Sequence, residues 1–174
     1  LGDVYKRQAC YIPKKFLPAE EFARGRNIET KKLEALGIKG FVVPEESVEE
    51  LALKAVENLN EIVNIKPEEI SGLYVATENI RYKSLGLDKP LISMIRKKLK
   101  KDLRHVCSDT VISACNSGVN ALLRGLYEVS YFKRRGKDKK VLVITSDIAI
   151  YPENSKGEKT QGAGACAILV NNPY

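Results

Sequence analysis

Residues 107–132 read CSDTVISACNSGVNALLRGLYEVSYF and place a cysteine where an apolar, strand-like run passes into a helix. The run over 107–115 has the length of a strand, and the small polar sequence NSG follows Cys115 directly. Over 116–132 apolar residues recur at three- and four-residue steps, which predicts an amphipathic helix. Its predicted apolar side consists of Val119, Leu122, Leu123, Leu126, Val129 and Phe132. The stretch therefore predicts a strand, a corner at Cys115 and a helix.

Helices and strand-like runs alternate along the rest of the chain. The clearest helix covers 46–64, where Ser47 and Glu50 have the spacing of a capping box. Further helices are predicted over 16–26 and 89–101 and at the start of 29–44, before a stop at Gly37. Strands are predicted over 9–13, 70–78, 139–147 and 164–170. Because the strands are nearly continuous apolar runs, we expect one α/β domain whose strands are buried on both faces.

The composition of the 174-residue chain is globular, with 44% hydrophobic and 29% charged residues. The formal net charge is +7, and the basic residues concentrate in RKKLKKDLRH (96–105) and KRRGKDKK (133–140). Neither run has interleaved aromatic residues, so a solvated helix end and a connecting loop are favoured over a nucleic-acid patch. Weak attraction of an anionic substrate is a third interpretation. No apolar run has the length of a membrane span, so we expect a soluble protein.

The cysteines do not form a metal-binding pattern. Their spacing matches no zinc site, and His105 is the single histidine. The four cysteines are Cys10, Cys107, Cys115 and Cys166. We expect reduced thiols in a cytoplasmic protein, with every cysteine except Cys115 in the core.

Both ends of the chain read as cut. LGDVYKRQ (1–8) resembles a stretch that recurs as a spurious translated end, so we expect it to be non-native. The chain stops at VNNPY, directly after a strand-like run. We therefore expect one domain over 9–174, truncated before a second half.

Cys115 is a candidate nucleophile because it stands just before a helix. A thiol attacks as its thiolate, and the free N–H groups and dipole of a helix N-terminus stabilise negative charge. The small residues Ala114, Ser117 and Gly118 permit close approach of a thioester, whose oxyanion nearby backbone N–H groups can hold. From position alone, an ordinary buried cysteine is the alternative.

Glu78 is a second candidate, because it ends the strand-like run GLYVATE between Thr77 and Asn79. In α/β sheets, groups at the carboxyl ends of strands line the site, and Cys115 also follows a strand. A carboxylate there can act as general acid or base toward a cysteine-bound acyl group. A solvated loop glutamate is the alternative.

Three segments resemble the 3-hydroxy-3-methylglutaryl-CoA (HMG-CoA) synthase family. They are VATEN (75–79), SACNSG (113–118) and KKVLVITSDIAIYPENSKGEKTQGAGACAILV (139–170). The third is the most specific, because SDIA, a tyrosine, NS, GE and TQGAGA occur in the family's order. The resemblance implies an α/β thiolase-like fold, layered α-β-α-β-α, of which this chain supplies the N-terminal half only.

The resemblance also implies a mechanism and its participants. Acetyl-CoA acylates Cys115, Glu78 takes a proton from the acetyl methyl group, and the carbanion attacks the ketone of acetoacetyl-CoA. Water then releases HMG-CoA and regenerates the thiol. By the same resemblance, Asn154 and Thr160 contact the substrate or its CoA arm, although a turn before a strand explains them as well. No cofactor beyond the CoA thioesters is implied, and the family suggests a homodimer.

The sequence departs from the family in two places. The family usually has a tyrosine and a glycine after the cysteine, where this chain has Asn116 and Ser117. Relatives that form β-branches in polyketides often carry serine at the second position, so an acyl carrier protein is an alternative carrier of the acetoacetyl group. The family's catalytic histidine lies in the second half, and His105 does not match it. An initiating ketoacyl-acyl carrier protein synthase and a non-catalytic partner subunit are further alternatives.

Overall fold

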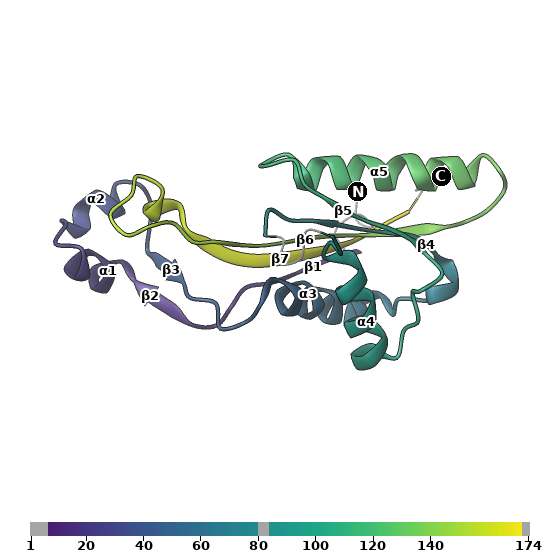
Figure 1. Cartoon of the computed structure of the whole chain (residues 1–174), viewed down its shortest axis with the longest axis horizontal. Helices are drawn as coiled ribbons and strands as arrows, with labels where there is room; N and C mark the ends of the chain where they lie inside the picture. The colour runs from purple at the N-terminus through teal and green to yellow at the C-terminus, as the bar shows by residue number, and fades with distance from the viewer. Residues whose placement is uncertain (1–6, 80–83, 172–174) are drawn as a thin grey trace.

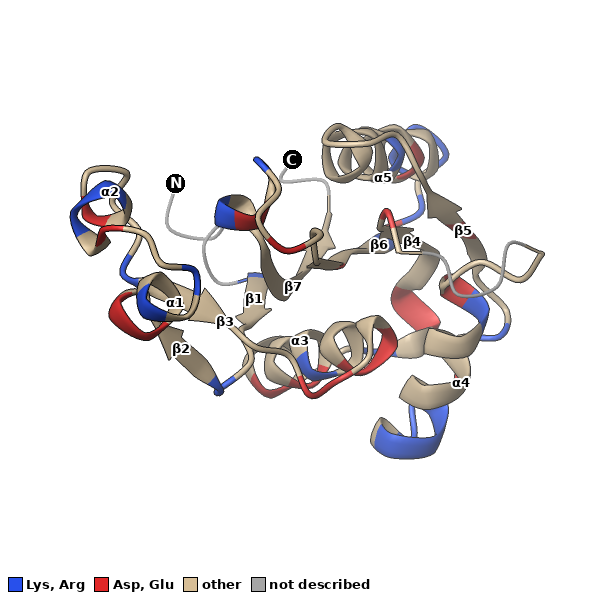
Figure 2. Cartoon of the chain, turned by 60° about the vertical axis from the view of Figure 1, so that its left-hand side comes forward, with Lys and Arg blue, Asp and Glu red and all other residues tan. Residues whose placement is uncertain are grey.

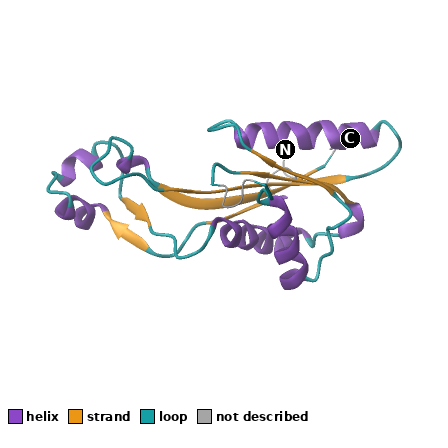
Figure 3. Cartoon of the chain, in the orientation of Figure 1, coloured by secondary structure: helices purple, strands orange, loops and turns teal. Residues whose placement is uncertain are grey.

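The computed structural model describes residues 7–79 and 84–171, which form one layered α/β unit and a small appendage. The main sheet has five strands in the order β1-β7-β6-β4-β5. Their bounds are β1 Gln8–Tyr11, β4 Ile70–Ala76, β5 Cys107–Val111, β6 Lys140–Ala149 and β7 Gly162–Val170. Helices α3 (Val48–Val63) and α4 (Asp88–Leu99) cover one face, and α5 (Ser117–Lys133) covers the other (Figures 1 and 3).

The strand directions decide which ends of the chain segments meet. β4 runs parallel to both β5 and β6, whereas β7 is antiparallel to β6 and β1 is antiparallel to β7. The carboxyl ends of β4, β5 and β6 therefore lie along one edge of the sheet. This edge runs across the strand ends and is distinct from the outer strands β1 and β5. The segments that follow these three ends are the corner before α5, the turn after β4 and the β6–β7 loop.

The appendage lies beyond this edge (Figure 1). It consists of β2 Phe16–Pro18, α1 Ala19–Gly25, α2 Thr30–Glu34 and β3 Gly40–Val42. The two strands pair with each other, and Phe22, Leu33 and Phe41 form its small core. The sequence predicted a helix over all of 16–26, but Phe16–Pro18 is a strand because its backbone pairs with β3. Gly37, at φ +74°, ends the α2 turn as predicted.

Helix α3 confirms the clearest element of the sequence prediction. The amide of Ser47 donates to the Glu50 carboxylate at 2.7 Å, and the amide of Glu50 donates to Ser47 Oγ at 3.3 Å. This reciprocal pair is the predicted capping box. The buried side of the helix packs in the larger core with residues of β4, α4 and β7.

Helix α5 packs on the sheet through a side that overlaps the predicted apolar side only in part, at Val129 and the half-buried Leu122. Ala121, Gly125 and Val129 are buried against the sheet, and a Cβ built on Gly125 lies 3.1 Å from Val143 Cγ2. Much of the predicted apolar side instead faces outward, with Val119 58% exposed. Small residues occupy the side of the helix that faces the sheet, because they let the helix axis approach the strands closely. The outward apolar row comprises Val119, Leu123, Leu126, Tyr127 and Tyr131.

Two cysteines that were predicted to lie in the core are exposed. Cys10 is in β1 and Cys107 is in β5, the two edge strands of the sheet, each of which has a neighbouring strand on one side only. Cys166 is partly buried, and burial together with the nearby Cys10 thiol raises its pKa to about 12. Periodicity within a strand does not reveal which strands stand at the edges, so it missed this exposure.

The start of the chain is partly inside the sheet. Gln8, assigned by the sequence to the excluded stretch 1–8, pairs with Ile168 as the first residue of β1. Residues 1–6 of that stretch lie outside the described residues. Among the residues that the structure describes, no helix is long and apolar enough to cross a membrane.

A polar triad fastens β1 to the start of α3. Tyr11 Oη and Lys54 Nζ each donate to Glu46 Oε1 at 2.5 Å. The hydrogen bond from Lys54, followed by that from Tyr11, lowers the pKa of Glu46 to about 2. Because this folded-state pKa is below the unfolded one, the stabilisation is complete above the ordinary value of 4.5 and is lost as the pH falls toward about 2.

Replacing Glu46 with glutamine is therefore expected to make the free energy of unfolding depend less on pH in the acidic range. The variant should be less stable than the wild type near neutral pH, and the difference should shrink as the pH falls through that window. Urea unfolding across the pH range measures it. Glu45→Gln, which breaks only an exposed pair with Lys15, is the control and should change little. Parallel pH profiles for Glu46→Gln and the wild type would contradict the assignment.

Candidate active site

Cys115 lies on a tight, strained turn between β5 and α5. β5 ends at Val111, four residues earlier than the predicted strand, because the backbone turns to reach the helix. Ala114 has a φ of +48°, a left-handed conformation that a residue with a side chain rarely adopts. Such strain persists only where surrounding contacts enforce it, and it gathers at functional sites. Cys115 itself is exposed.

Ser117 provides the contacts that hold this turn. It is buried, with only 5% of its surface exposed. Its Oγ accepts a hydrogen bond from the amide of Ser113 at 2.7 Å and donates to the carbonyl of Ala114 at 2.8 Å. The Ser117 side chain thus bridges the backbone on both sides of the strained residue, and it fixes where Cys115 points relative to the start of α5.

Glu78 lies at the same sheet edge as Cys115. It follows β4, which is hydrogen-bonded to β5, and the amide of Thr77 donates to the carbonyl of Val111 at 3.3 Å. The two predicted residues therefore stand on segments that leave neighbouring parallel strands. Glu78 is exposed in the described chain. Its successors 80–83 lie outside the described residues.

Asp147 of β6 fixes the segment that carries Glu78. Its Oδ2 accepts a hydrogen bond from the amide of Glu78 at 3.2 Å, and its Oδ1 accepts one from Asn79 Nδ2. Asn79 Nδ2 also donates to the carbonyl of Ile148 at 2.8 Å. These contacts join two segments about 70 positions apart in the chain. Asp147 belongs to the SDIA segment, and no role was predicted for it from the sequence.

The structure separates the two further predicted contact residues, Asn154 and Thr160. Asn154, at φ +60°, helps to line a cavity of about 330 Å³ between the β6–β7 loop and the appendage. Thr160 does not line this cavity, and its Oγ1 donates to the carbonyl of Gly157 at 2.7 Å, as in an ordinary turn. That both residues contact the substrate or its CoA arm stays a prediction.

An ion pair that the sequence analysis missed holds this loop against the appendage. Arg26 Nε donates to Glu158 Oε1 at 2.7 Å, and Glu158 is almost fully buried. The other oxygen of Glu158 accepts from the amide of Asn154 at 2.8 Å. Burial acts to raise the pKa of Glu158, but the hydrogen bonds from Arg26 and Asn154 outweigh it, so the pKa is lowered. The ion pair thereby positions Asn154 at the cavity.

His105 belongs neither to the region of Cys115 and Glu78 nor to the cavity beside Asn154. It precedes β5, whereas Cys115 follows it, and its Nε2 lies 3.1 Å from the carbonyl of Pro67. Its exposed position agrees with the interpretation that it does not match the family's catalytic histidine. Within residues 7–79 and 84–171, no cluster of His, Cys, Asp and Glu side chains is suited to a metal ion.

Comparisons with known proteins identify the family. The profile of the family described as "Hydroxymethylglutaryl-coenzyme A synthase N terminal" matches residues 5–173. Hydroxymethylglutaryl-CoA synthase A of Dictyostelium discoideum is 30% identical over 166 residues, 92% of this chain and 33% of that protein. The mitochondrial synthase of Rattus norvegicus is 28% identical over 92% of this chain and 31% of its own length. The chain thus spans about a third of these curated relatives.

A solved structure gives the same result for the fold. The structure described as "MvaS in complex with 3-hydroxy-3-methylglutaryl coenzyme A" superposes with a TM-score of 0.82 at 30% identity, over 94% of this chain and 38% of that one. The thiolase-like half predicted from the sequence is confirmed, and the match sets the HMG-CoA synthases above the ketoacyl synthase alternative. The chain belongs to the HMG-CoA synthase N-terminal domain family.

Proposed function

We propose that the protein containing this chain condenses an acetyl group with an acetoacetyl thioester to form an HMG thioester. The observation that carries this proposal is the exposed thiol of Cys115 at a strained strand-to-helix corner, with Glu78 at the same sheet edge. The chain supplies these two groups, and the remaining two thirds of the relatives' length supplies the rest of the site.

The first half-reaction is an acyl transfer to Cys115. The Cys115 thiolate attacks the carbonyl of acetyl-CoA, the carbon–sulfur bond to CoA breaks, and CoA leaves as its thiol after taking up a proton. The N-terminus of α5 follows directly. The amides of Asn116 and Ser117 already donate to the carbonyls of Ser113 and Ala114, at 3.1 and 3.0 Å, so these two amides are not free to bind an oxyanion. The helix dipole favours both the thiolate and the oxyanion of the acyl-transfer transition state.

The second half-reaction makes the carbon–carbon bond and needs a base. Glu78 removes a proton from the methyl group of acetyl-Cys115, and the resulting carbanion attacks the ketone of the acetoacetyl thioester. Water then hydrolyses the thioester to Cys115, which frees the product and restores the thiol. Asp147 is a positioning residue in this scheme, because its two oxygens hold the Glu78–Asn79 backbone and side chain.

The outward apolar row of α5 supports the presence of a second half. Val119, Leu123, Leu126 and Tyr127 form most of this apolar row on α5, which begins at Ser117, two residues after Cys115. In the five-layered arrangement of the fold, this helix lies between the two halves, so the second half covers that row and excludes water from the thiol. We also expect a homodimer and a compartment with reduced thiols; the curated relatives include mitochondrial synthases.

A carrier-protein substrate is a second candidate, and Ser117 favours it. This serine stands where carrier-dependent relatives carry one, and here it is buried and braces the corner. The full-length protein should be given acetyl-CoA with either acetoacetyl-CoA or acetoacetyl-acyl carrier protein, and HMG thioester formation followed by mass spectrometry. Product on CoA supports the first candidate and product on the carrier supports the second. If no HMG thioester forms with either acetoacetyl substrate, the proposed function is refuted.

Replacing Asp147 is expected to slow condensation without blocking acetylation of Cys115. Asp147→Ala frees the Glu78 segment, and a misplaced base costs about 100-fold in kcat. Asp147→Asn keeps one acceptor oxygen, so it should recover part of the rate. The KM for acetyl-CoA should stay near that of the wild type in both variants. Equal losses in acetylation and condensation would show instead a general collapse of the site.

A further inference from the structure

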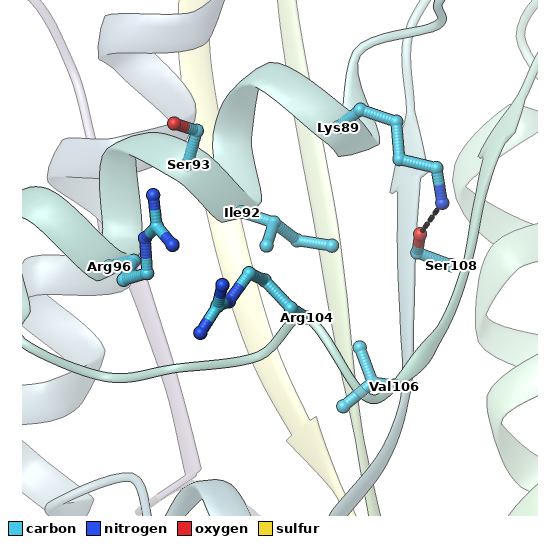
Figure 4. A pocket seen from close by; sticks show the side chains of 7 residues that line it. All are labelled: Lys89, Ile92, Ser93, Arg96, Arg104, Val106 and Ser108. Carbon is cyan, nitrogen blue, oxygen red and sulfur yellow. Dashed lines mark hydrogen bonds between the residues drawn. The ribbon is translucent and has the colours of Figure 1, made fainter.

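The basic run 96–105, which the proposed function leaves unused, forms one wall of a pocket at the end of α4. Figure 2 shows Lys and Arg positions, in blue, along the ribbon at the carboxyl-terminal end of this helix. The pocket has a volume of about 280 Å³ and lies between α4 and the segment leading into β5. Its lining includes three cations over an apolar floor, namely Lys89, Arg96 and Arg104 above Ile92 and Val106, with Ser108 at one side (Figure 4).

The three cations differ in how far the protein already neutralises them. Lys89 Nζ lies 3.2 Å from the buried carboxylate of Asp88 and donates to Ser108 Oγ at 2.6 Å. The guanidinium of Arg104 is held by Asp102, with a closest distance of 2.5 Å.

Arg96 has no such partner in the described part of the chain, where it makes neither a hydrogen bond nor an ion pair. Its charge acts on Asp102 only through space, and it contributes to lowering the pKa of that carboxyl.

Arg96 and Arg104 also lie on the same side of the pocket (Figure 4). Two guanidinium groups that face one cavity repel each other, and the Asp102 carboxylate is already engaged by Arg104. An added anion between them removes this repulsion and supplies the acceptors that Arg96 lacks. The planar fork of a guanidinium matches the geometry of phosphate oxygens in particular.

The pocket is separate from the candidate active site. α4 packs in the core on the α3 side of the sheet, whereas α5, which begins after Cys115, packs on the other side (Figure 1). Val106 and Ser108 are at the start of β5, and Cys115 follows its end. An occupant of the pocket therefore does not reach the thiol.

We propose that this pocket binds a small phosphate ester or diphosphate. Its phosphate group lies between Arg96 and Arg104, with Lys89 within reach of a second charged oxygen. A short apolar part of the ligand lies on Ile92 and Val106, which are less than a tenth exposed. The inference does not depend on the proposed condensation.

Calorimetric titration of the full-length protein tests the site with two probes, inorganic pyrophosphate and phenyl phosphate, and with inorganic phosphate as the reference for the phenyl group. Arg96→Ala should weaken pyrophosphate binding by about tenfold or more, since a charge-assisted hydrogen-bonded contact is lost. Lys97→Ala is the matched control, because it removes one positive charge from the next position of the same helix without touching the pocket. It should weaken binding by less than about threefold, as expected for a screened surface charge.

Two results would overturn the site. One is that neither probe binds measurably. The other is equal weakening by Arg96→Ala and Lys97→Ala, which would show diffuse attraction by the basic run. Acetylation of Cys115 should be unchanged in Arg96→Ala, so failure of this site and failure of the proposed function give different readouts. Selective weakening by Arg96→Ala, with stronger binding of phenyl phosphate than of inorganic phosphate, supports both the cations and the apolar floor.

Discussion

Replacing Cys115 with alanine is expected to abolish condensation by the full-length protein, lowering kcat by about 10⁴-fold or more. The side chain is the only group at the corner that can carry a covalent acyl intermediate in the proposed scheme. The Ala114 turn and the Ser117 bridge do not involve the thiol, so the variant should keep its fold. Steady-state formation of the HMG thioester measures the loss, and circular dichroism checks the fold.

Cys10→Ala is the matched control for this variant. Cys10 is also an exposed cysteine, but it lies in β1, at the opposite edge of the sheet from β5. Its replacement should leave turnover near the wild-type value. Comparable turnover in Cys115→Ala and Cys10→Ala would remove Cys115 from the mechanism.

The second large effect is expected for Glu78→Gln, which should lower the condensation rate by about 10³-fold. Glutamine keeps the size of the side chain and the backbone contact to Asp147, but it cannot accept the methyl proton. The variant should still form acetyl-Cys115, because acyl transfer to the thiolate does not need this base. A block after acetylation is therefore the signature of the assigned role.

Glu61→Gln serves as the control for charge, since Glu61 is an exposed glutamate of α3 on the other side of the sheet. It should leave both steps unchanged. If Glu78→Gln prevented acetylation as strongly as condensation, Glu78 would be acting in the first step or in folding. If neither step changed, the carboxylate would be a solvated loop residue.

The elements that the sequence predicted best are those whose signals are local. The capping box of Ser47 and Glu50 and the glycine stop at Gly37 depend on residues within one turn, and both are present in the structure. The sheet-facing side of α5 was predicted only in part. Val129 is buried as expected, whereas Ala121 and Gly125 were missed because the closeness of the strands, rather than hydrophobicity, selects small residues there. The exposure of Cys107 likewise depends on the position of β5 at the sheet edge.

The candidate site shows the same contrast between local signals, which the sequence reveals, and contacts between distant segments, which it does not. Cys115 and Glu78 were predicted because each ends its own strand-like run and stands in a short segment that resembles the family, signals visible within a few residues. The supporting contacts were not, because they join distant segments. Arg26 and Glu158 are 132 positions apart, and Asp147 is 69 positions from Glu78. The acidic residues stand in the SDIA and GE segments, so the motif signalled that they matter without revealing their partners.

The proposal that Cys115 accepts the acetyl group is tested most directly by peptide mass spectrometry of the full-length protein after brief incubation with acetyl-CoA. The account predicts an acetyl thioester on the peptide that contains Cys115, sensitive to neutral hydroxylamine, and none on the peptides of Cys10, Cys107 or Cys166. The same adduct should accumulate in Glu78→Gln when the acetoacetyl thioester is present. No acetylation of Cys115, or acetylation of another cysteine in its place, would contradict the account and favour a non-catalytic partner subunit.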